Sequence, residues 1–265
     1  MEVQSLGYRS DLMLLGLQGS VVVDRGDHLV IRTPENPGFH WGNFVLADQT
    51  WVNRPLSDLV AVFHAEHPQA GHLALGVDGV EGLVWADDEL AECGLEVERS
   101  VVMAATEVHA PAHPHAEAVC RMLDSDADWA AAVDLHASEP GTFDPAENRD
   151  FTERRMTARR EHQGAGLGGW FGAFIDGEMV CGLGLFTDGS GLGRFQDVMT
   201  VVSARGRGLA STLVHHASRV GIRAYGIREL VMVADPDYAA IRIYRSLGFV
   251  GSEIQVELAR PVHGP

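Results

Sequence analysis

Residues 201–210 read VVSARGRGLA, and this stretch decides how the rest of the chain is interpreted. It separates an apolar segment at 195–202, which predicts a β-strand, from an amphipathic segment at 209–225, which predicts a helix. Gly206 and Gly208 let a ligand approach the main chain closely, and free N–H groups at a helix N-terminus carry partial positive charge. The stretch therefore predicts a pyrophosphate site, and a plain glycine-rich turn is the alternative.

Helix and strand patterns alternate on both sides of this loop. The predicted strands are 119–123, 170–175, 179–186, 195–202, 230–233 and 249–258, and the predicted helices are 124–137, 147–163, 209–225 and 238–247. Asp176 and Gly177 predict a tight hairpin between two of the strands. This order predicts the α/β fold class, with a mixed central sheet flanked by helices.

The N-terminal half carries a weaker version of the same pattern. Its predicted strands are 21–24, 28–33, 38–46, 73–77 and 95–105, and its predicted helices are 56–67 and 87–93. In both halves a helix leads to an apolar strand, a second helix, a glycine (Gly94 or Gly248) and a last strand. We interpret this as two tandem lobes that arose by duplication, with chance similarity of common α/β units as the alternative.

The segment VHAPAHPHAE at 108–117 separates the halves, so we expect an N-terminal lobe at 1–107, a linker at 108–117 and a C-terminal domain at 118–265. The linker histidines His109, His113 and His115 are metal-ligand types, but no carboxylate or thiol support accompanies them in a defined geometry. We therefore favour a solvated linker and expect no metal.

Composition narrows the function classes. The chain has 20 basic residues, all Arg, and 37 acidic residues, for a formal charge of −17, which disfavours nucleic acid as a partner. No apolar run is long enough to cross a membrane, and the N-terminus lacks the pattern of a signal peptide. The three cysteines form no disulfide framework. We expect a cytoplasmic protein, either a monomer whose lobes form a pseudo-dimer or a homodimer.

The loop Arg205-Gly206-Arg207-Gly208-Leu209-Ala210 resembles the phosphate loop of the GNAT family of acetyl-CoA-dependent N-acetyltransferases, Arg/Gln-x-x-Gly-x-Gly/Ala. A later family element reads roughly Asn-x-x-Ala-x-x-x-Tyr-x-x-x-Gly-Phe. Asp237, Ala240, Tyr244, Gly248 and Phe249 occupy those places, with Asp instead of Asn. The resemblance extends over about 119–259, and the order of predicted elements is similar to the family's fold.

The resemblance implies acetyl-CoA as co-substrate, held by this loop. The implied pyrophosphate ligands are the main-chain amides of Arg207, Gly208, Leu209 and Ala210. Main-chain groups of Thr200, Val201 and Val202 would pair with the pantetheine arm, and Asp237 stands where the family's Asn meets the cofactor.

Tyr244 stands where many relatives place the acid that protonates the leaving thiolate, and core packing is its alternative role. Asp197 lies where relatives often carry a carboxylate, which makes it a candidate base, with a solvated or structural Asp as the alternative. Strand alternation predicts that Gln196 faces the opposite side of the sheet. His136, Glu147 and Glu153 lie in or near the helices that form the family's acceptor wall.

Phe39, Trp41 and Asn43, in PENPGFHWGNF, are candidates for one wall of the acceptor pocket, and aromatic core packing is the alternative. The N-terminal half has no Arg-x-x-Gly-x-Gly/Ala sequence, so we expect a degenerate lobe and one CoA per chain. The expected activity is direct transfer of an acetyl group from acetyl-CoA to a primary amine in a ternary complex, with Cys181 as a buried structural thiol. The alternatives are a non-catalytic acyl-CoA sensor and an acetylase that acts on proteins.

Overall fold

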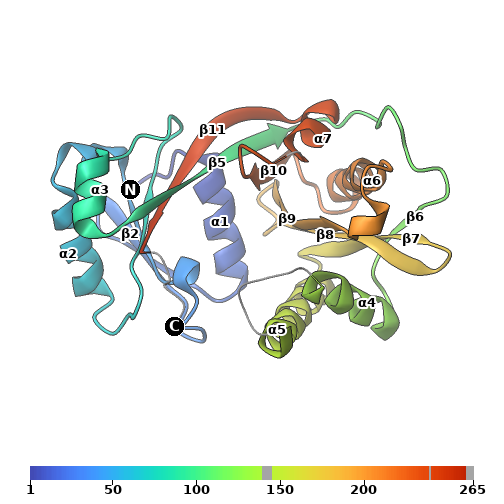
Figure 1. The fold of residues 1–265 in the computed structure, drawn as a ribbon, viewed down its shortest axis with the longest axis horizontal. Helices are drawn as coiled ribbons and strands as arrows, with labels where there is room; N and C mark the ends of the chain where they lie inside the picture. The colour runs from blue at the N-terminus through green and yellow to red at the C-terminus, as the bar shows by residue number, and fades with distance from the viewer. Residues whose placement is uncertain (139–144, 239, 261–265) are drawn as a thin grey trace. The chain divides into compact units, whose positions relative to one another are not determined.

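The computed structural model describes residues 1–138, 145–238 and 240–260, which fall into two compact units (Figure 1). Unit 1 comprises 1–103, 233–238 and 251–265, and unit 2 comprises 104–232 and 239–250. These units interleave along the chain, because the C-terminal strand belongs to the unit that contains the N-terminus. The boundaries expected from the sequence, with an N-terminal lobe at 1–107, a linker at 108–117 and a C-terminal domain at 118–265, stay a prediction.

Unit 2 has the element order expected from the sequence. Its elements are β6 (Val119–Met122), α4 (Asp126–Ala137), α5 (Pro145–Gly164), β7 (Gly168–Ile175), β8 (Glu178–Phe186), β9 (Leu192–Thr200), α6 (Leu209–Ala224), β10 (Glu229–Ala234) and α7 (Ala240–Ser246). The strand order is β10-β9-β8-β7-β6, parallel between β10 and β9 and antiparallel elsewhere. Helices α4 and α5 cover one face of these strands and α6 covers the other (Figure 1). The predicted mixed α/β fold is confirmed.

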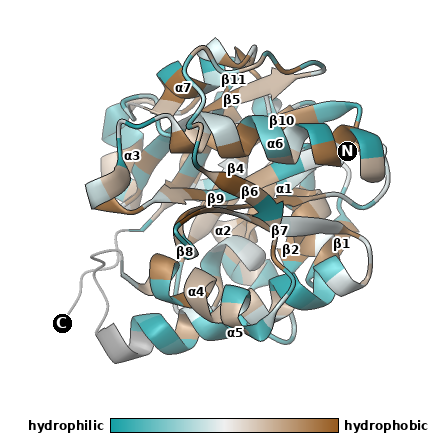
Figure 2. Ribbon diagram, turned by 90° about the vertical axis from the view of Figure 1, so that its right-hand side faces the viewer, coloured by the Kyte–Doolittle hydropathy of each residue, from teal (hydrophilic) through white to brown (hydrophobic). Residues whose placement is uncertain are grey.

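Local signals explain why unit 2 folds in this way. The Ser125 side chain accepts from the amide of Asp128 while the Asp128 carboxylate accepts from the amide of Ser125, a reciprocal cap that starts α4. Asp176 and Gly177 both adopt positive φ, as the two-residue turn between β7 and β8 requires. Helix α6 buries an apolar stripe that includes Leu213, Val214 and Ala217, whereas hydrophilic segments recur along α5 (Figure 2).

Unit 1 contains a second sheet region. Its elements are α1 (Leu6–Leu17), β1 (Val21–Asp24), β2 (His28–Arg32), β3 (Val45–Ala47), α2 (Leu56–Glu66), β4 (Ala74–Val77), α3 (Asp87–Cys93), most of β5 (Glu96–Ala105) and most of β11 (Val250–Ala259). The strand order is β1-β2-β3-β4-β11-β5. A core of apolar side chains from β3, β4, α2, α3 and β11 lies on one side of these strands.

One sequence expectation for unit 1 is wrong, and one helix was missed. The predicted strand at 38–46 is a 3-10 turn, His40–Gly42, followed by the short strand β3. Asn43 closes this loop, because its side chain accepts from the amide of Thr33 and donates to the carbonyls of Asn36 and Phe39. Helix α1 was not expected, and it buries residues on most of its circumference and so lacks a clear amphipathic period.

The last strand, β11, completes unit 1. It pairs antiparallel with β4, with Val256 opposite Val77 and Leu258 opposite Leu75. The Tyr8 hydroxyl donates to the carbonyl of Val256, which ties α1 to the same strand. Glu253 accepts from the amide of Leu6 at 2.8 Å, so β11 also supplies the anion that caps α1. The core of unit 1 is therefore built from both ends of the chain.

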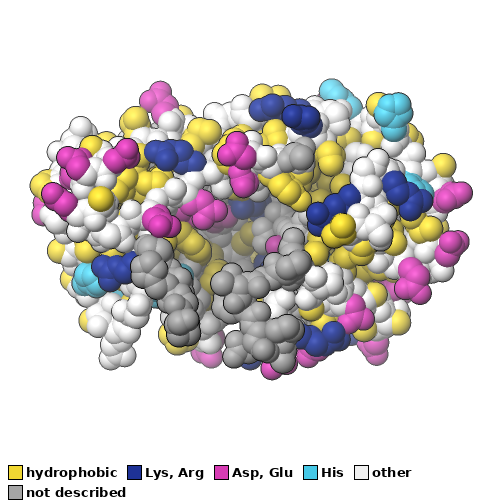
Figure 3. All heavy atoms as spheres, in the orientation of Figure 1, with side chains coloured by type: hydrophobic (Ala, Val, Ile, Leu, Met, Phe, Trp, Pro, Cys, Tyr) yellow, Lys and Arg dark blue, Asp and Glu magenta, His cyan; other side chains and the backbone are white. Residues whose placement is uncertain are grey.

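Acidic side chains outnumber basic ones on the face shown in Figure 3, in line with the net charge of −17. Over the described residues, no helix is both long and apolar enough to cross a lipid bilayer.

Candidate active site

The paired strands β9 and β10 of unit 2 separate before β9 ends. Their pairing joins Leu192–Arg194 to Glu229–Val231, and β9 continues to Thr200 without a β10 partner in the described part of the chain. A strand edge of this kind offers main-chain N–H and C=O groups to an extended ligand. Val201 is already engaged, because its amide donates to Val180 and its carbonyl accepts from Ala204.

Helix α6 begins immediately beyond this edge. Gly208 is its N-cap, with a φ of 80°, and neither a side-chain cap nor an acidic residue occupies its first turn. By contrast, α3 and α4 carry acidic residues in their first turns. The loop residues Arg205, Gly206 and Arg207 are exposed, and Gly206 also has a positive φ. The first turn of α6 is thus an uncompensated positive end beside an open strand edge, which suits an anion.

The linker at 108–117 lies against this helix end. The amide of His115 donates to the Thr212 hydroxyl at 3.0 Å, and the amide of His109 donates to the carbonyl of Leu247 at 2.8 Å. A Cβ on Gly208 would lie 2.3 Å from the carbonyl oxygen of His113. Glycine at 208 is therefore required by the close approach of the linker as well as by its backbone conformation.

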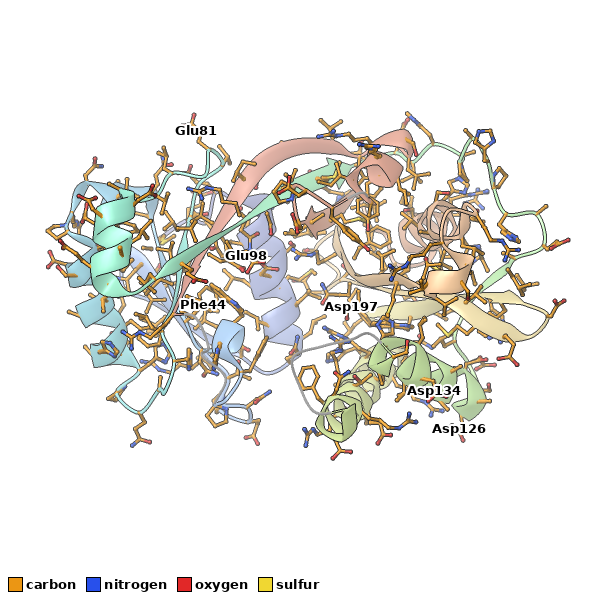
Figure 4. The ribbon with its side chains drawn as sticks, viewed as in Figure 1. Phe44, Glu81, Glu98, Asp126, Asp134 and Asp197 are labelled. Carbon is orange, nitrogen blue, oxygen red and sulfur yellow. The ribbon has the colours of Figure 1, made fainter. Side chains whose placement is uncertain are left out.

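A β-bulge shapes the centre of β9. The register with β8 shifts between Gly182 and Gly184, and Asp197 sits in the left-handed region with a φ of 49°. The expectation that Gln196 and Asp197 face opposite sides is wrong, because both contact arginines of α5. Gln196 accepts from Arg159 at 3.1 Å, and Asp197 pairs with Arg155 at 3.4 Å. Figure 4 marks Asp197 on the side of the sheet that α4 and α5 cover.

Burial sets the charge of the neighbouring side chains. Burial lowers the pKa of His136 to about 4, with Asp197 opposing the shift, so this imidazole is neutral at pH 7. Within the described ranges its buried Nε2 has no hydrogen-bond partner, and the ring packs edge-on against Trp170. Glu153 is exposed and pairs with Arg149, and the side chain of Glu147 lies outside the described residues. Asp197 is therefore the carboxylate that the bulge presents on this face.

Tyr244 is buried on α7, with 5% of its surface exposed, and its ring meets Phe249 edge-on at 6.3 Å. Phe249 also contacts Phe195 of β9, so an aromatic chain links Tyr244 to the strand with the open edge. Both the acid and the packing role fit this placement.

The other predicted site residues lie in unit 1. Asp237 is exposed, and its amide donates to the side chain of Asp235. Phe39 and Trp41 pack against the cluster around Tyr8 and Phe44. The side chain of Asn43 is used in hydrogen bonds within its own loop. These contacts fit structural roles, and substrate binding by Phe39, Trp41 and Asn43 stays a prediction.

The thiol of Cys181 is fully buried, and burial raises its pKa to about 12, so it is a poor nucleophile. Thr200 contacts its sulfur at 3.1 Å. Within the described residues, no group of three or more His, Cys, Asp or Glu side chains is arranged to hold a metal ion.

One family model matches the part of the chain that carries this geometry. Residues 129–249 match the family model described as the acetyltransferase (GNAT) family. No curated protein matches the sequence.

Several solved structures share the fold. A functionally unknown conserved protein from Staphylococcus epidermidis aligns with a TM-score of 0.73 at 12% identity, covering 91% of this chain and 94% of that one. A GCN5-related N-acetyltransferase from Kribbella flavida gives 0.65 at 20% identity over 97% and 96%. A tandem GNAT protein from the clavulanic acid biosynthesis pathway gives 0.56 at 14% identity over 98% and 97%. At these identities the likeness concerns the fold alone.

Proposed function

From the match of residues 129–249 to the acetyltransferase (GNAT) family model, we propose that the protein is a member of this family and moves an acetyl group from acetyl-CoA to a primary amine. The observation that carries the proposal is the open edge of β9 leading to the uncompensated first turn of α6. That pair of features matches the two parts of the cofactor, an extended amide-containing arm and a pyrophosphate.

The cofactor site is proposed on main-chain groups of unit 2. Amides of Arg207, Gly208, Leu209 and Ala210 bind the pyrophosphate at the first turn of α6. The pantetheine arm is proposed to meet the main chain of Thr200, Val201 and Val202. The carbonyls of Thr200 and Val202 accept from Arg205 and that of Val201 accepts from Ala204, so the arm replaces internal hydrogen bonds there. The exposed guanidinium groups of Arg205 and Arg207 add positive charge beside the phosphates.

The transfer is proposed to be direct, in a ternary complex. The neutral amine attacks the thioester carbonyl, the new C–N bond forms, and the C–S bond breaks as the tetrahedral intermediate collapses. Asp197 accepts the proton that the amine loses, and Tyr244 donates a proton to the departing thiolate. A thiol pKa of about 12 at Cys181 argues against an acyl-enzyme through this residue.

Unit 1 is proposed to bind no CoA. In the internal repeat, α2 corresponds to α6, and its N-terminus is closed in three ways. Pro55 at the N-cap has no N–H, Asp58 lies in the first turn, and the Glu89 carboxylate accepts from the amide of Leu56 at 3.2 Å. An internal carboxylate thus holds the place that a phosphate would take, so one CoA per chain is expected.

Transfer is tested by following thiol release from acetyl-CoA with a panel of primary amines, with mass spectrometry of the acetylated product. Tyr244→Phe is expected to keep CoA affinity and to lower kcat by about 100-fold. Tyr225→Phe is the matched control, because this tyrosine donates to the sulfur of Met122 and is placed outside the proposed site. An unchanged kcat for Tyr244→Phe, with chemistry rate-limiting, would leave Tyr244 as a packing residue.

A non-catalytic acyl-CoA sensor is the competing function. It predicts CoA binding without amine-dependent thiol release across the panel. The presence of Asp197 on a bulge and Tyr244 on α7 favours the enzyme, since a sensor needs neither group.

A further inference from the structure

The arginines of α5 differ in whether they have an acidic partner. Three of them pair with carboxylates: Arg149 with Asp134 at 2.9 Å, Arg155 with Asp197 at 3.4 Å, and Arg160 with Asp126 at 2.7 Å. The helix also carries Arg154, which is exposed, and Arg159, which is buried with 6% of its surface exposed. Among the described residues Arg159 forms no ion pair with a carboxylate. Its Nη2 donates to the neutral amide oxygen of Gln196, and its Nε and Nη1 are buried and have no hydrogen-bond partner among the residues that the structure describes.

A buried guanidinium in this state is costly. Burial lowers the pKa of Arg159, and Asp197 opposes that shift while Arg155 adds to it. A guanidinium stays protonated in proteins, so the charge remains. Asp197 is therefore shared between two arginines, and the neighbouring His136 is neutral. Phe186, 5.2 Å from the Arg159 guanidinium carbon, provides a π face but accepts no in-plane N–H bond. The cluster of Arg155, Arg159 and Asp197 therefore holds an excess of positive charge that an anion would balance.

The excess charge lies next to an accessible point. The side chains of Arg155 and Asp197 are 30% and 32% exposed, so the ion pair opens to solvent at the bulge. Arg159 follows Arg155 by four residues and thus lies on the same face of α5, one turn further along. The two guanidinium groups lead from the exposed bulge into the interior, beside the carboxylate proposed as the base.

We propose that the acceptor is an amino carboxylate, a small molecule bearing a primary amine and a carboxylate, and that Arg159 together with Arg155 binds its carboxylate. The inference rests on the proposed transfer reaction and adds the substrate class. The substrate carboxylate takes the place of Gln196 as acceptor for the Arg159 guanidinium and also accepts from its unpartnered N–H groups. Planar guanidinium and carboxylate groups match in a bidentate pair, which favours this contact. Anchoring that end places the amine of the same molecule near Asp197.

The test compares matched amines that differ in one group: glycine with glycinamide and leucine with leucinamide, each with saturating acetyl-CoA. For each pair the ratio of kcat/KM, acid over amide, is measured in the wild type, in Arg159→Gln and in Arg160→Gln. Comparing the ratios between proteins cancels the intrinsic reactivity of each amine. Arg160 is the control, since it lies on the same helix but is exposed and paired with Asp126.

We expect the wild type to prefer the acids, and Arg159→Gln to lower the acid-over-amide ratio by about 10- to 100-fold, the effect of losing a charge-assisted hydrogen bond. Arg160→Gln leaves the ratio unchanged, and both variants keep the wild-type affinity for CoA. A ratio that does not respond to Arg159→Gln, or a wild type that prefers the amides, overturns the inference. A preference for O-phosphoethanolamine over β-alanine would replace the carboxylate by a phosphate and likewise overturn it.

Two further measurements keep the outcome interpretable. If Arg159→Gln loses its cooperative thermal transition, Arg159→Lys is used, which keeps the charge and removes the fork, and the acid-over-amide ratio is again expected to fall. If no amine is acetylated, the proposed transfer fails, and calorimetric titration of glycine and leucine into the CoA-loaded protein decides the inference separately. Binding by wild type and not by Arg159→Gln supports the carboxylate site, and equal or absent binding overturns it.

Discussion

Replacing Leu258 by alanine tests whether the C-terminal strand completes the core of unit 1. Leu258 is fully buried, stands opposite Leu75 in the pairing of β11 with β4, and belongs to the apolar cluster that contains Trp51 and Trp85. Leu→Ala changes at such sites cost about 2 to 5 kcal/mol, and we expect about 3 kcal/mol here. With a typical urea dependence, this loss lowers the unfolding midpoint by about 1 to 2 M.

The assay is urea unfolding followed by tryptophan fluorescence, since Trp51 and Trp85 report on the same cluster. Val250→Ala is the matched control, because Val250 lies on the same strand but is 67% exposed, and it is expected to change stability by less than about 0.5 kcal/mol. If Leu258→Ala moves the midpoint no further than Val250→Ala does, β11 does not contribute to this core and the description of unit 1 is wrong.

The remaining predictions concern stability. Asn43→Ala, which removes three loop hydrogen bonds, is expected to lower the free energy of unfolding by about 2 kcal/mol, and a change confined to KM with no loss of stability would instead place Asn43 in the acceptor pocket. Hydrogen bonds from Arg25, together with Arg32, lower the pKa of Glu66 from 4.5 to about 2, so the ion pair stabilises the folded state above pH 4.5 and this stabilisation is lost as the pH falls toward 2. Urea unfolding of the wild type and of Glu66→Gln at pH 5 and pH 3 checks this, and an equal difference in stability at both pH values contradicts it. A 117–265 fragment is expected to aggregate, because β11 loses β4 and its apolar partners there, and a fragment of 1–107 is expected not to fold without β11; soluble, cooperatively unfolding fragments in size-exclusion chromatography and thermal melts would contradict both.

The sequence predicted what local chemistry determines. The turn at Asp176-Gly177 and the glycine-rich start of α6 are decided by residues within a few positions of one another. The order of elements in unit 2 followed from these signals and from hydrophobic periodicity. The candidate phosphate loop was found in the same way, since its residues are contiguous.

Features that depend on distant contacts could not be predicted. The partner of β11 is chosen by apolar burial against β4, and nothing in residues 250–259 themselves specifies a strand from the other end of the chain. The bulge at Asp197 breaks the strict alternation on which the orientation of Gln196 was predicted. Which α5 arginines form ion pairs with α4 depends on how the two helices pack, and the charge pattern along the sequence does not reveal it.

The most direct test of the account is calorimetric titration of CoA into the full chain, the Arg207→Glu variant and the Glu89→Gln variant. Arg207→Glu places a negative charge at the first turn of α6 without the contact with the linker that a larger side chain at Gly208 would make. The account predicts one CoA per chain, an affinity at least about 10-fold weaker in Arg207→Glu, and no change in Glu89→Gln. Two CoA molecules per chain, or equal affinity in the wild type and Arg207→Glu, would contradict the assignment of the site to β9 and α6.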